Sequence, residues 1–180
     1  MASSCPTVET ERLILRPFRE HDLDDYTALI QAPEVRASLH SPDDIGREQA
    51  WQQMAAWLGQ WELRGTGHWA AIEKASGAFV GRVGSHRPER ADWPGIEIGW
   101  ALHPDHWGKG YATEAGRASI EYALAHHDVD AVFSVILPEN AASEAVARRL
   151  GFELFEMRVT SHFPSSPHGI WRLARQRAET

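Results

Sequence analysis

The chain begins with a stretch in which apolar and polar residues alternate. Residues 10–18 are Thr-Glu-Arg-Leu-Ile-Leu-Arg-Pro-Phe, which is the pattern of a β-strand with one buried face. Two further stretches of β-forming residues, His68–Glu73 and Phe79–His86, flank Lys-Ala-Ser-Gly at positions 74–77. A short polar turn between two such stretches predicts a hairpin. The first half of the chain therefore contributes several strands to a sheet.

Two helices are predicted between the first strand and this hairpin. Asp22 is a favoured N-cap residue, and Pro33 ends the pattern that follows it. The apolar residues between them recur at helical spacing: Leu23, Tyr26 and Ile30. A second helix is expected from about Gly46 to Leu63, where large apolar residues recur at spacings of three and four: Trp51, Met54, Leu58 and Trp61. A stripe at this period usually packs a helix onto a sheet, and we favour that interpretation over an aromatic cage for a substrate.

The second half has the pattern of strand, helix, strand, helix. The predicted elements are Ile96–His103, Gly110–His126, Ala131–Leu137 and Asn140–Leu150. Because crossovers between parallel strands are right-handed, the two strands of this unit should lie parallel. Two final strands, near Phe152–Thr160 and Gly169–Arg175, should flank a loop over Ser161–His168. Strands and helices in this order predict an α/β (α+β) fold.

Length and composition indicate one globular domain. With 180 residues, the chain suits a single domain, 1–180, whose first eight residues we expect to be loose. Hydrophobic residues make up 43% and charged residues 24%, as in ordinary soluble proteins. The net charge of -7 argues against a nucleic-acid partner, because phosphate groups are neutralised by clustered Lys and Arg. An acidic surface would instead attract a cationic amine.

The cysteine and histidine content narrows the chemistry. Cys5 is the only cysteine, so no internal disulfide can form and a reducing compartment is expected. No apolar stretch approaches the length of a membrane span, and the first residues lack the features of a secretory signal, so we expect a cytoplasmic protein with no membrane partner. The ten histidines include His103 with His106 and the adjacent His126 and His127, but no third ligand falls into register. No metal site is predicted.

One segment, residues 102–114, indicates a ligand. It is predicted as a strand end, a loop with Gly108 and Gly110, and a helix start, so several main-chain N–H groups should converge on one point and bind an anion. The phosphate loop of nucleoside-triphosphatases is excluded, since Lys109 is followed by glycine and not by Ser or Thr. A dinucleotide-binding fingerprint would need a third glycine where this chain has Thr113. A simple glycine turn between strand and helix stays an alternative.

Three motifs resemble the GNAT superfamily of acyltransferases. Residues 107–112, Trp-Gly-Lys-Gly-Tyr-Ala, are similar to its coenzyme A loop, Gln/Arg-x-x-Gly-x-Gly/Ala, except at the first position. The alternating segment 10–18 is similar to the N-terminal strand of the superfamily. Residues 138–152 resemble its second signature, in which Asn140 caps a helix that ends at Leu-Gly-Phe. Within the superfamily, residues 107–115 are most similar to the branch that acetylates the N-termini of ribosomal proteins.

This resemblance implies a fold, a cofactor and its contacts. The fold would be a GNAT-like mixed, mostly antiparallel sheet of six to seven strands with helices on both faces. The cofactor would be acetyl-CoA, with its pyrophosphate on the glycine loop and its pantetheine arm between the strands that end at Leu102 and Leu137. Leu102 would pair with the pantetheine amides through its main chain, and Asn140 would both cap its helix and contact the pantetheine. The cofactor-binding residues expected in this way are Leu102, Trp107, Gly108, Lys109, Gly110, Tyr111, Ala112, Thr113 and Asn140.

The resemblance also implies catalytic groups. Glu97, between two isoleucines of a strand, stands where the family has its usual candidate base, which acts through water. A solvated carboxylate or a partner for an arginine is the alternative role. Ala147 stands where many members carry a tyrosine as general acid, so Ser143 on the same helix becomes the candidate proton donor near the sulfur. A main-chain N–H near residues 100–102 would stabilise the oxyanion.

The expected activity is therefore transfer of an acetyl group from acetyl-CoA to a primary amine, on a protein N-terminus or a small molecule, by direct attack. A non-catalytic module that binds or senses acyl-CoA is the alternative from another class. The walls of the acceptor site should come from residues 35–44, the second helix and the loop 161–168. Exposed tryptophans make a homodimer an option alongside a monomer.

Overall fold

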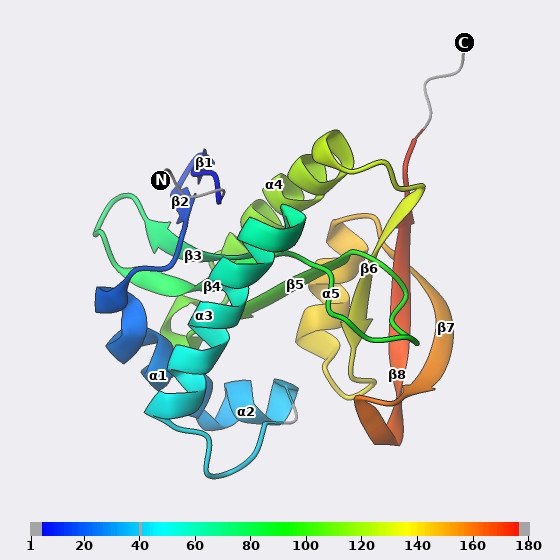
Figure 1. Cartoon of the computed structure of the whole chain (residues 1–180), viewed down its shortest axis with the longest axis horizontal. Helices are drawn as coiled ribbons and strands as arrows, with labels where there is room; N and C mark the ends of the chain where they lie inside the picture. Colours follow the sequence, from blue (N-terminus) through cyan, green and yellow to red (C-terminus); the bar gives the residue numbers. More distant parts are fainter. Residues whose placement is uncertain (1–4, 40, 177–180) are drawn as a thin grey trace.

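The computed structural model describes residues 5–39 and 41–176. A mixed sheet of eight strands forms its centre, in the order β1-β2-β3-β4-β5-β6-β8-β7 (Figure 1). Neighbouring strands are antiparallel except β5 and β6, which are parallel. The predicted mixed, mostly antiparallel sheet and its parallel pair are confirmed, although the sheet has eight strands and not six or seven.

The elements follow one another along the chain much as the sequence predicts. The strands are β1 (Val8–Glu9), β2 (Leu13–Arg16), β3 (Gly67–Glu73), β4 (Phe79–His86), β5 (Glu97–Leu102), β6 (Ala131–Ile136), β7 (Glu153–Thr160) and β8 (Phe163–Ala174). The helices are α1 (Leu23–Gln31), α2 (Pro33–Leu39), α3 (Arg47–Arg64), α4 (Tyr111–His126) and α5 (Ala141–Arg149). Short 3-10 turns, η1 and η2, lie at Glu20–Asp22 and Pro104–His106.

The eighth strand, β1, comes from the end of the N-terminal segment for which the sequence predicts a loose chain. β1 pairs with β2, and the Trp69 indole N–H donates to the Pro6 carbonyl at 2.8 Å. Cys5 is 4% exposed, and burial raises the pKa of its thiol to about 12, which makes it unreactive. Residues 5–8 are thus held against the sheet. The remaining part of that prediction, residues 1–4, lies outside the described residues.

Helices cover both faces of the sheet. α1, α2 and α3 pack on one face around Tyr26 and Met54, whereas α4 and α5 pack on the other around Ile120 and Leu150 (Figure 1). The predicted end of α1 before Pro33 is correct, but Pro33 also begins α2, because proline is well tolerated in the first turn of a helix. Across the described ranges, no helix has both the length and the apolar composition that crossing a bilayer requires.

The apolar stripe predicted on α3 is only partly correct. Trp51 is 52% exposed and Leu58 is 37% exposed, so neither lies in the core. The residues that do face inward are Ala50, Met54, Trp57 and Trp61. Both sets of residues recur at helical spacing. A pattern of large apolar residues does not identify the inward set, because that set includes the small Ala50. The inward set brings Trp57, half-buried, over the sheet.

The two parallel strands separate soon after they meet. β5 and β6 are in register only at Glu97 and Phe133, and the Phe133 N–H donates to the Ile96 carbonyl at 2.9 Å. Beyond this point β5 continues to Leu102 beside β4, and β6 continues to Ile136 beside β8. Main-chain groups on the two facing edges are therefore left without a neighbouring strand.

The predicted loop 161–168 is wrong. β8 begins at Phe163, and in its pairing with β7 Phe163 lies opposite Thr160 and His168 lies opposite Arg158. Pro164 and Pro167 favour a loop because proline cannot donate to a strand ladder. They are tolerated here because β6 pairs with β8 only from Gly169 onward, which leaves residues 163–168 with a neighbouring strand on one side alone.

Candidate functional site

A cavity of about 540 Å³ lies at the C-terminal end of β5. Its walls are the end of β5, the glycine loop, the first turn of α4 and part of α5. Predicted site residues that line it are Leu102, Trp107, Gly108, Gly110, Tyr111, Ala112, Thr113, Asn140 and Ser143. Lys109 is exposed and does not line the cavity, and Glu97 lies outside it.

The glycine loop presents main-chain donors to this cavity. Gly108 and Gly110 have φ values of 74° and 81°, in the left-handed region that glycine adopts without strain. The first hydrogen bond inside α4 runs from the Glu114 N–H to the Gly110 carbonyl at 3.0 Å. The N–H groups of residues 111–113 therefore have no acceptor within the helix. Together with the positive end of the helix dipole, they form a site for an anion.

Glu114 fixes the loop and α4 to the N-terminal part of the sheet. Its carboxylate accepts hydrogen bonds from the Thr10 hydroxyl at 2.6 Å and from the Arg12 main-chain N–H at 2.7 Å. The Arg12 guanidinium pairs with the same carboxylate at 2.7 Å and donates to the Lys109 carbonyl at 2.8 Å. Burial opposes ionisation, but the bonds from Thr10 and Arg12 lower the pKa of Glu114 overall. Arg12 and Glu114 are thus structural members of the loop that sequence analysis missed.

The main chain of Leu102 faces the cavity and not β4. Leu102 lies opposite Gly81, and the next residue, His103, donates its N–H to the Val80 carbonyl at 3.0 Å. This alternation makes the Leu102–Gly81 pair a non-hydrogen-bonded one, so both main-chain groups of Leu102 point away from β4. The Leu102 carbonyl accepts a hydrogen bond from the Trp107 indole N–H at 2.7 Å. Trp107 therefore uses one of the two lone pairs on that oxygen.

Asn140 and Ser143 stand at the start of α5, next to β5. The Asn140 side-chain oxygen accepts a hydrogen bond from the Ser143 N–H at 3.0 Å, which confirms its capping role. The Asn140 amide nitrogen is left to donate elsewhere. The Ser143 hydroxyl accepts a hydrogen bond from the Trp100 indole N–H at 3.3 Å. Ala147, at the position where the resemblance leads one to expect a tyrosine, is fully buried.

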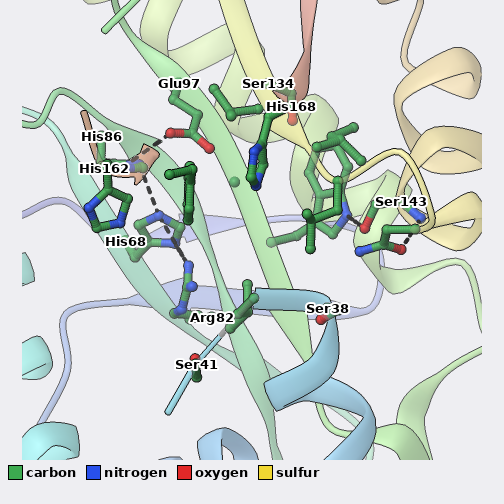
Figure 2. Close-up of a pocket in the computed structure, with 18 of the residues that line it drawn as sticks. Ser38, Ser41, His68, Arg82, His86, Glu97, Ser134, Ser143, His162 and His168 are labelled. Atoms are coloured by element: carbon green, nitrogen blue, oxygen red, sulfur yellow. Dashed lines mark hydrogen bonds and ion pairs between the residues drawn. The ribbon is translucent and has the colours of Figure 1, made fainter. Parts of the chain in front are cut away.

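A second cavity, of about 350 Å³, contains Glu97 (Figure 2). Its floor is formed by β3, β4 and β5, and its walls come from α2, α3 and the hairpin of β7 and β8. Each segment predicted to form the acceptor walls contributes to it: Ser38 from residues 35–44, Trp57 from α3 and His162 from the hairpin. Residue 40, within the first of these segments, lies outside the described residues.

Glu97 is buried in this second cavity, with 8% of its surface exposed. The Trp93 indole N–H donates to its carboxylate at 3.1 Å. Burial raises the pKa of Glu97 to about 7, although the nearby Arg82 and the Trp93 bond act in the opposite direction. Burial excludes the solvated carboxylate that the sequence left open, and Glu97 forms no ion pair with an arginine in the part of the chain that the structure describes. A carboxyl group that is half ionised near neutral pH suits a general base.

Two histidines link Glu97 to Arg82 (Figure 2). Arg82 Nη1 lies 3.0 Å from His68 Nδ1, His68 Nε2 lies 3.3 Å from His86 Nδ1, and His86 Nε2 lies 3.4 Å from Glu97 Oε2. Burial lowers the pKa of His86 to about 3 and lowers that of His68 strongly, so both rings are neutral. Arg82 Nη1 also lies 3.3 Å from His68 Nε2, and because a guanidinium only donates, it donates to the nitrogen of the neutral ring that carries no proton. These contacts connect the Arg82 guanidinium to the Glu97 carboxylate through two neutral rings.

Sequence analysis assigned no role to His68, Arg82 and His86. The signal was present as polar side chains inside strands: His68 before the apolar residues 69–72 of β3, and Arg82 and His86 four residues apart in β4. Residues an even number apart in a strand share a face, so the last two point to the same side of the sheet. Among residues 5–39 and 41–176, no three His, Cys, Asp or Glu side chains are arranged to hold a metal ion.

The two cavities meet beside the gap between β5 and β6. Four residues line both cavities: Ser38, Trp100, Asn140 and Ser143. The structure therefore brings Ser143 and Asn140 to the junction, the glycine loop to one side of it and Glu97 to the other. A molecule that lies along the first cavity reaches the second at this junction.

Comparison with known proteins agrees with this arrangement. Residues 12–153 match the family described as acetyltransferase (GNAT) domain. A crystal structure described as the acetyltransferase from Agrobacterium tumefaciens is 30% identical, with 94% of this chain and 95% of that chain covered and a TM-score of 0.81. A Bacillus subtilis protein named as an uncharacterized N-acetyltransferase is 28% identical over 154 residues, 82% of this chain and 83% of its own. A structure described as a ribosomal-protein alpha-N acetyltransferase in complex with coenzyme A shares the fold, with 17% identity, 94% and 98% coverage and a TM-score of 0.76.

The family match extends from Arg12, just before β2, to the first residue of β7. It contains the glycine loop, α4, the separating strands β5 and β6, and α5. The 30% identical structure extends the likeness to nearly the whole chain. This protein therefore belongs to the GNAT acetyltransferase family.

Proposed function

We propose that this protein transfers an acetyl group from acetyl-CoA to the nitrogen of a primary amine. The observation that carries the proposal is the junction of the two cavities. A loop rich in main-chain donors opens one of them, and a buried carboxyl group with a pKa of about 7 lies in the other. Binding of an anionic carrier and removal of a proton are the two tasks that acetyl transfer to an amine requires.

The first cavity has the donors that coenzyme A requires. The N–H groups of residues 111–113 would bind its pyrophosphate, and Arg149, which lines the cavity, would add positive charge. The Leu102 main chain and the Asn140 amide nitrogen would meet the amides of the pantetheine, with Trp107 sharing the Leu102 carbonyl. When bound, the thioester supplies an activated acetyl group on a thiol whose pKa of about 8.5 makes it a tolerable leaving group.

Glu97 would accept the proton that the acceptor amine loses, directly or through a water molecule. Its pKa of about 7 lies close to the pH of the cell, where a general base is most effective. The hydrogen bond from Trp93 and the neighbouring His86 ring, 3.4 Å away, would hold the carboxylate in one orientation. An N-terminal α-amine, with a pKa of about 8, would lose its proton to this base more easily than a lysine amine with a pKa of about 10.4.

Two groups at the junction would stabilise developing charge. The main chain of Trp100 lies two residues before that of Leu102 in β5, so its N–H also points into the gap and would bind the thioester oxygen. The Ser143 hydroxyl accepts from the Trp100 indole and keeps its own proton to donate toward the sulfur, directly or through water. With Ala147 at the usual tyrosine position, Ser143 is the group we assign to this role.

The acceptor amine belongs to one of two classes. The resemblance of residues 107–115 to the ribosomal-protein branch favours a protein N-terminus, and the confined acceptor cavity of about 350 Å³ favours a small molecule. Both classes use the same base and the same thioester, so they differ only in the walls that surround the acceptor.

Release of free thiol from acetyl-CoA tests the proposal. The panel should include peptides with free N-termini, polyamines, aminoglycosides and amino acids, and we expect turnover with at least one of them. Glu97→Gln should lower turnover strongly and leave coenzyme A affinity unchanged, whereas Glu62→Gln, an exposed carboxylate on α3, should change neither. Binding of coenzyme A with no turnover across the panel would instead support a non-catalytic acyl-CoA module.

A further inference from the structure

The acceptor cavity is positively charged although the chain carries a net charge of -7. Of the described residues that line it, Arg82 and Arg90 are cationic and Glu97 is the one acid. Glu97 is half protonated near neutral pH, and the rings of His68 and His86 are neutral. The local charge of this cavity therefore differs from the net charge of the chain. An acceptor that carries a negative charge in addition to its amine would be attracted into it.

Arg82 is one of two arginines that line this cavity, and its charge acts on the Glu97 carboxylate. It forms no ion pair with a carboxylate of the described residues, and its contact with His68 is a bond to a neutral ring. Its Nε atom is buried and has no acceptor. A buried donor without an acceptor costs free energy, and a ligand oxygen would remove that cost. The guanidinium lies 5.4 Å from the centre of the Trp57 ring, which supports it from one side.

Space for a ligand lies next to these groups because residue 99 is glycine. A Cβ atom at this position would lie 3.0 Å from His68 Cε1 and 3.9 Å from Glu97 Oε1. A side chain at position 99 would therefore intrude between Glu97 and the histidine chain. Figure 2 shows Arg82 and Glu97 joined through the histidines on one side of the cavity, with Ser143 on the other. A ligand between them can reach the base, the cation and the junction.

Building on the acetyl transfer proposed above, we propose that the acceptor is a small aminocarboxylate whose carboxylate is bound by Arg82. The planar guanidinium would donate two parallel hydrogen bonds to the carboxylate, and the amine would face Glu97. In the reaction an N–C bond forms, the C–S bond of the thioester breaks and one amine proton passes to Glu97. The departing sulfur takes a proton from Ser143 or water, and the proton on Glu97 returns through water to restore it, so no net proton is gained or lost. The carboxylate of the acceptor is unchanged. In a protein N-terminus that carboxylate is part of a peptide bond, so the proposal favours a free small molecule.

Matched acceptor pairs test this proposal on the intact enzyme. Phenylalanine, β-alanine and γ-aminobutyrate vary the spacing between amine and carboxylate, and each is compared with its decarboxylated amine. We expect the preferred aminocarboxylate to have a kcat/KM about tenfold to a hundredfold above that of its partner, the value of a charge-assisted hydrogen bond. Arg82→Gln should remove this preference by raising the KM of the acid, whereas any change in kcat that acts through Glu97 should be the same for the acid and its decarboxylated partner; Arg82→Lys should keep part of the preference. Arg87→Gln, an exposed arginine just beyond β4, is the control.

The outcomes separate this proposal from the proposed function. Equal kcat/KM values for the acids and their decarboxylated partners in an active enzyme overturn the carboxylate site and leave acetyl transfer intact. This comparison needs only the unmodified protein, so it stands even where an Arg82 variant fails to fold. If no amine turns over, the acetyl transfer is contradicted, and the thermal shift that the same amino acids produce in the presence of coenzyme A decides the carboxylate site. A shift that Arg82→Gln removes supports the site, and no shift with any of them refutes it.

Discussion

Replacing Glu97 with glutamine should make the protein more stable and less active at the same time. Burial raises the pKa of this carboxyl group from 4.5 to about 7, so the folded protein binds its proton more tightly than the unfolded chain does. The stabilisation that this bound proton gives the folded protein is therefore fully present below the pKa of 4.5 in the unfolded chain, and it is lost as the pH rises through the pKa of about 7 in the folded protein. Glutamine has a similar shape and no charge, so Glu97→Gln avoids this loss.

The magnitude follows from the difference between the two pKa values. At about pH 8, holding the charged carboxylate in the cavity costs about 3 kcal/mol, and at about pH 5 it costs less than about 1 kcal/mol. Glu97→Gln should therefore raise the free energy of unfolding at the higher pH by up to this amount and by much less at the lower pH. Urea denaturation at both pH values measures the difference, with Glu62→Gln on the surface of α3 as the control.

The activity of the same variant gives the second half of the prediction. The kcat/KM of the unmodified enzyme should rise with pH through an inflection near 7, as Glu97 becomes ionised, and should rise again at higher pH as the free amine loses its proton. Glu97→Gln should lose about a hundredfold in kcat/KM and lose the inflection near pH 7. If the variant were equally destabilised at both pH values, or if its pH profile kept that inflection, then burial of a catalytic carboxyl group would be the wrong explanation.

Three further substitutions test other parts of the site. Gly108→Ala places a side chain at a φ of 74°, which costs about 1–2 kcal/mol. Calorimetry should show coenzyme A binding that is about tenfold weaker in this variant. Gly59→Ala in α3 is the control and should leave the binding unchanged. Gly99→Ala fills the floor of the acceptor cavity, so steady-state assays should show a lower kcat/KM for the amine with unchanged coenzyme A affinity; equal losses of both would contradict this role. Glu114→Ala removes the acceptor of Thr10 and Arg12, which lie between β1 and β2. Because these groups are partly exposed, the unfolding free energy should fall by about 1 kcal/mol in urea, while the exposed Glu121→Ala on the same helix should not lower it.

Features that depend on nearby residues could be predicted from the sequence. The glycine loop, the helix that follows it and the Asn140 cap are each encoded within a few positions, because glycine conformation and helix capping are local properties. The parallel pair of β5 and β6 followed from the handedness of a crossover, which needs no knowledge of side-chain contacts. These features placed most of the first cavity correctly.

Features that depend on contacts between distant segments could not be predicted. The chain of contacts from Arg82 through His68 and His86 to Glu97 depends on the register of three strands, which no single segment encodes. The raised pKa of Glu97 likewise results from burial that helices and a hairpin from other parts of the chain provide. The extension of β8 over Pro164 depends on where β6 ends, so proline alone gave the wrong answer there.

Calorimetric titration of the folded protein with coenzyme A tests the central claim most directly, because every proposed step begins with the carrier held on the loop after β5. The account predicts one bound molecule per chain, with an affinity that falls in Gly108→Ala and stays unchanged in Gly59→Ala. A folded protein that gives no binding heat at several temperatures, or an affinity that Gly108→Ala does not alter, would contradict it.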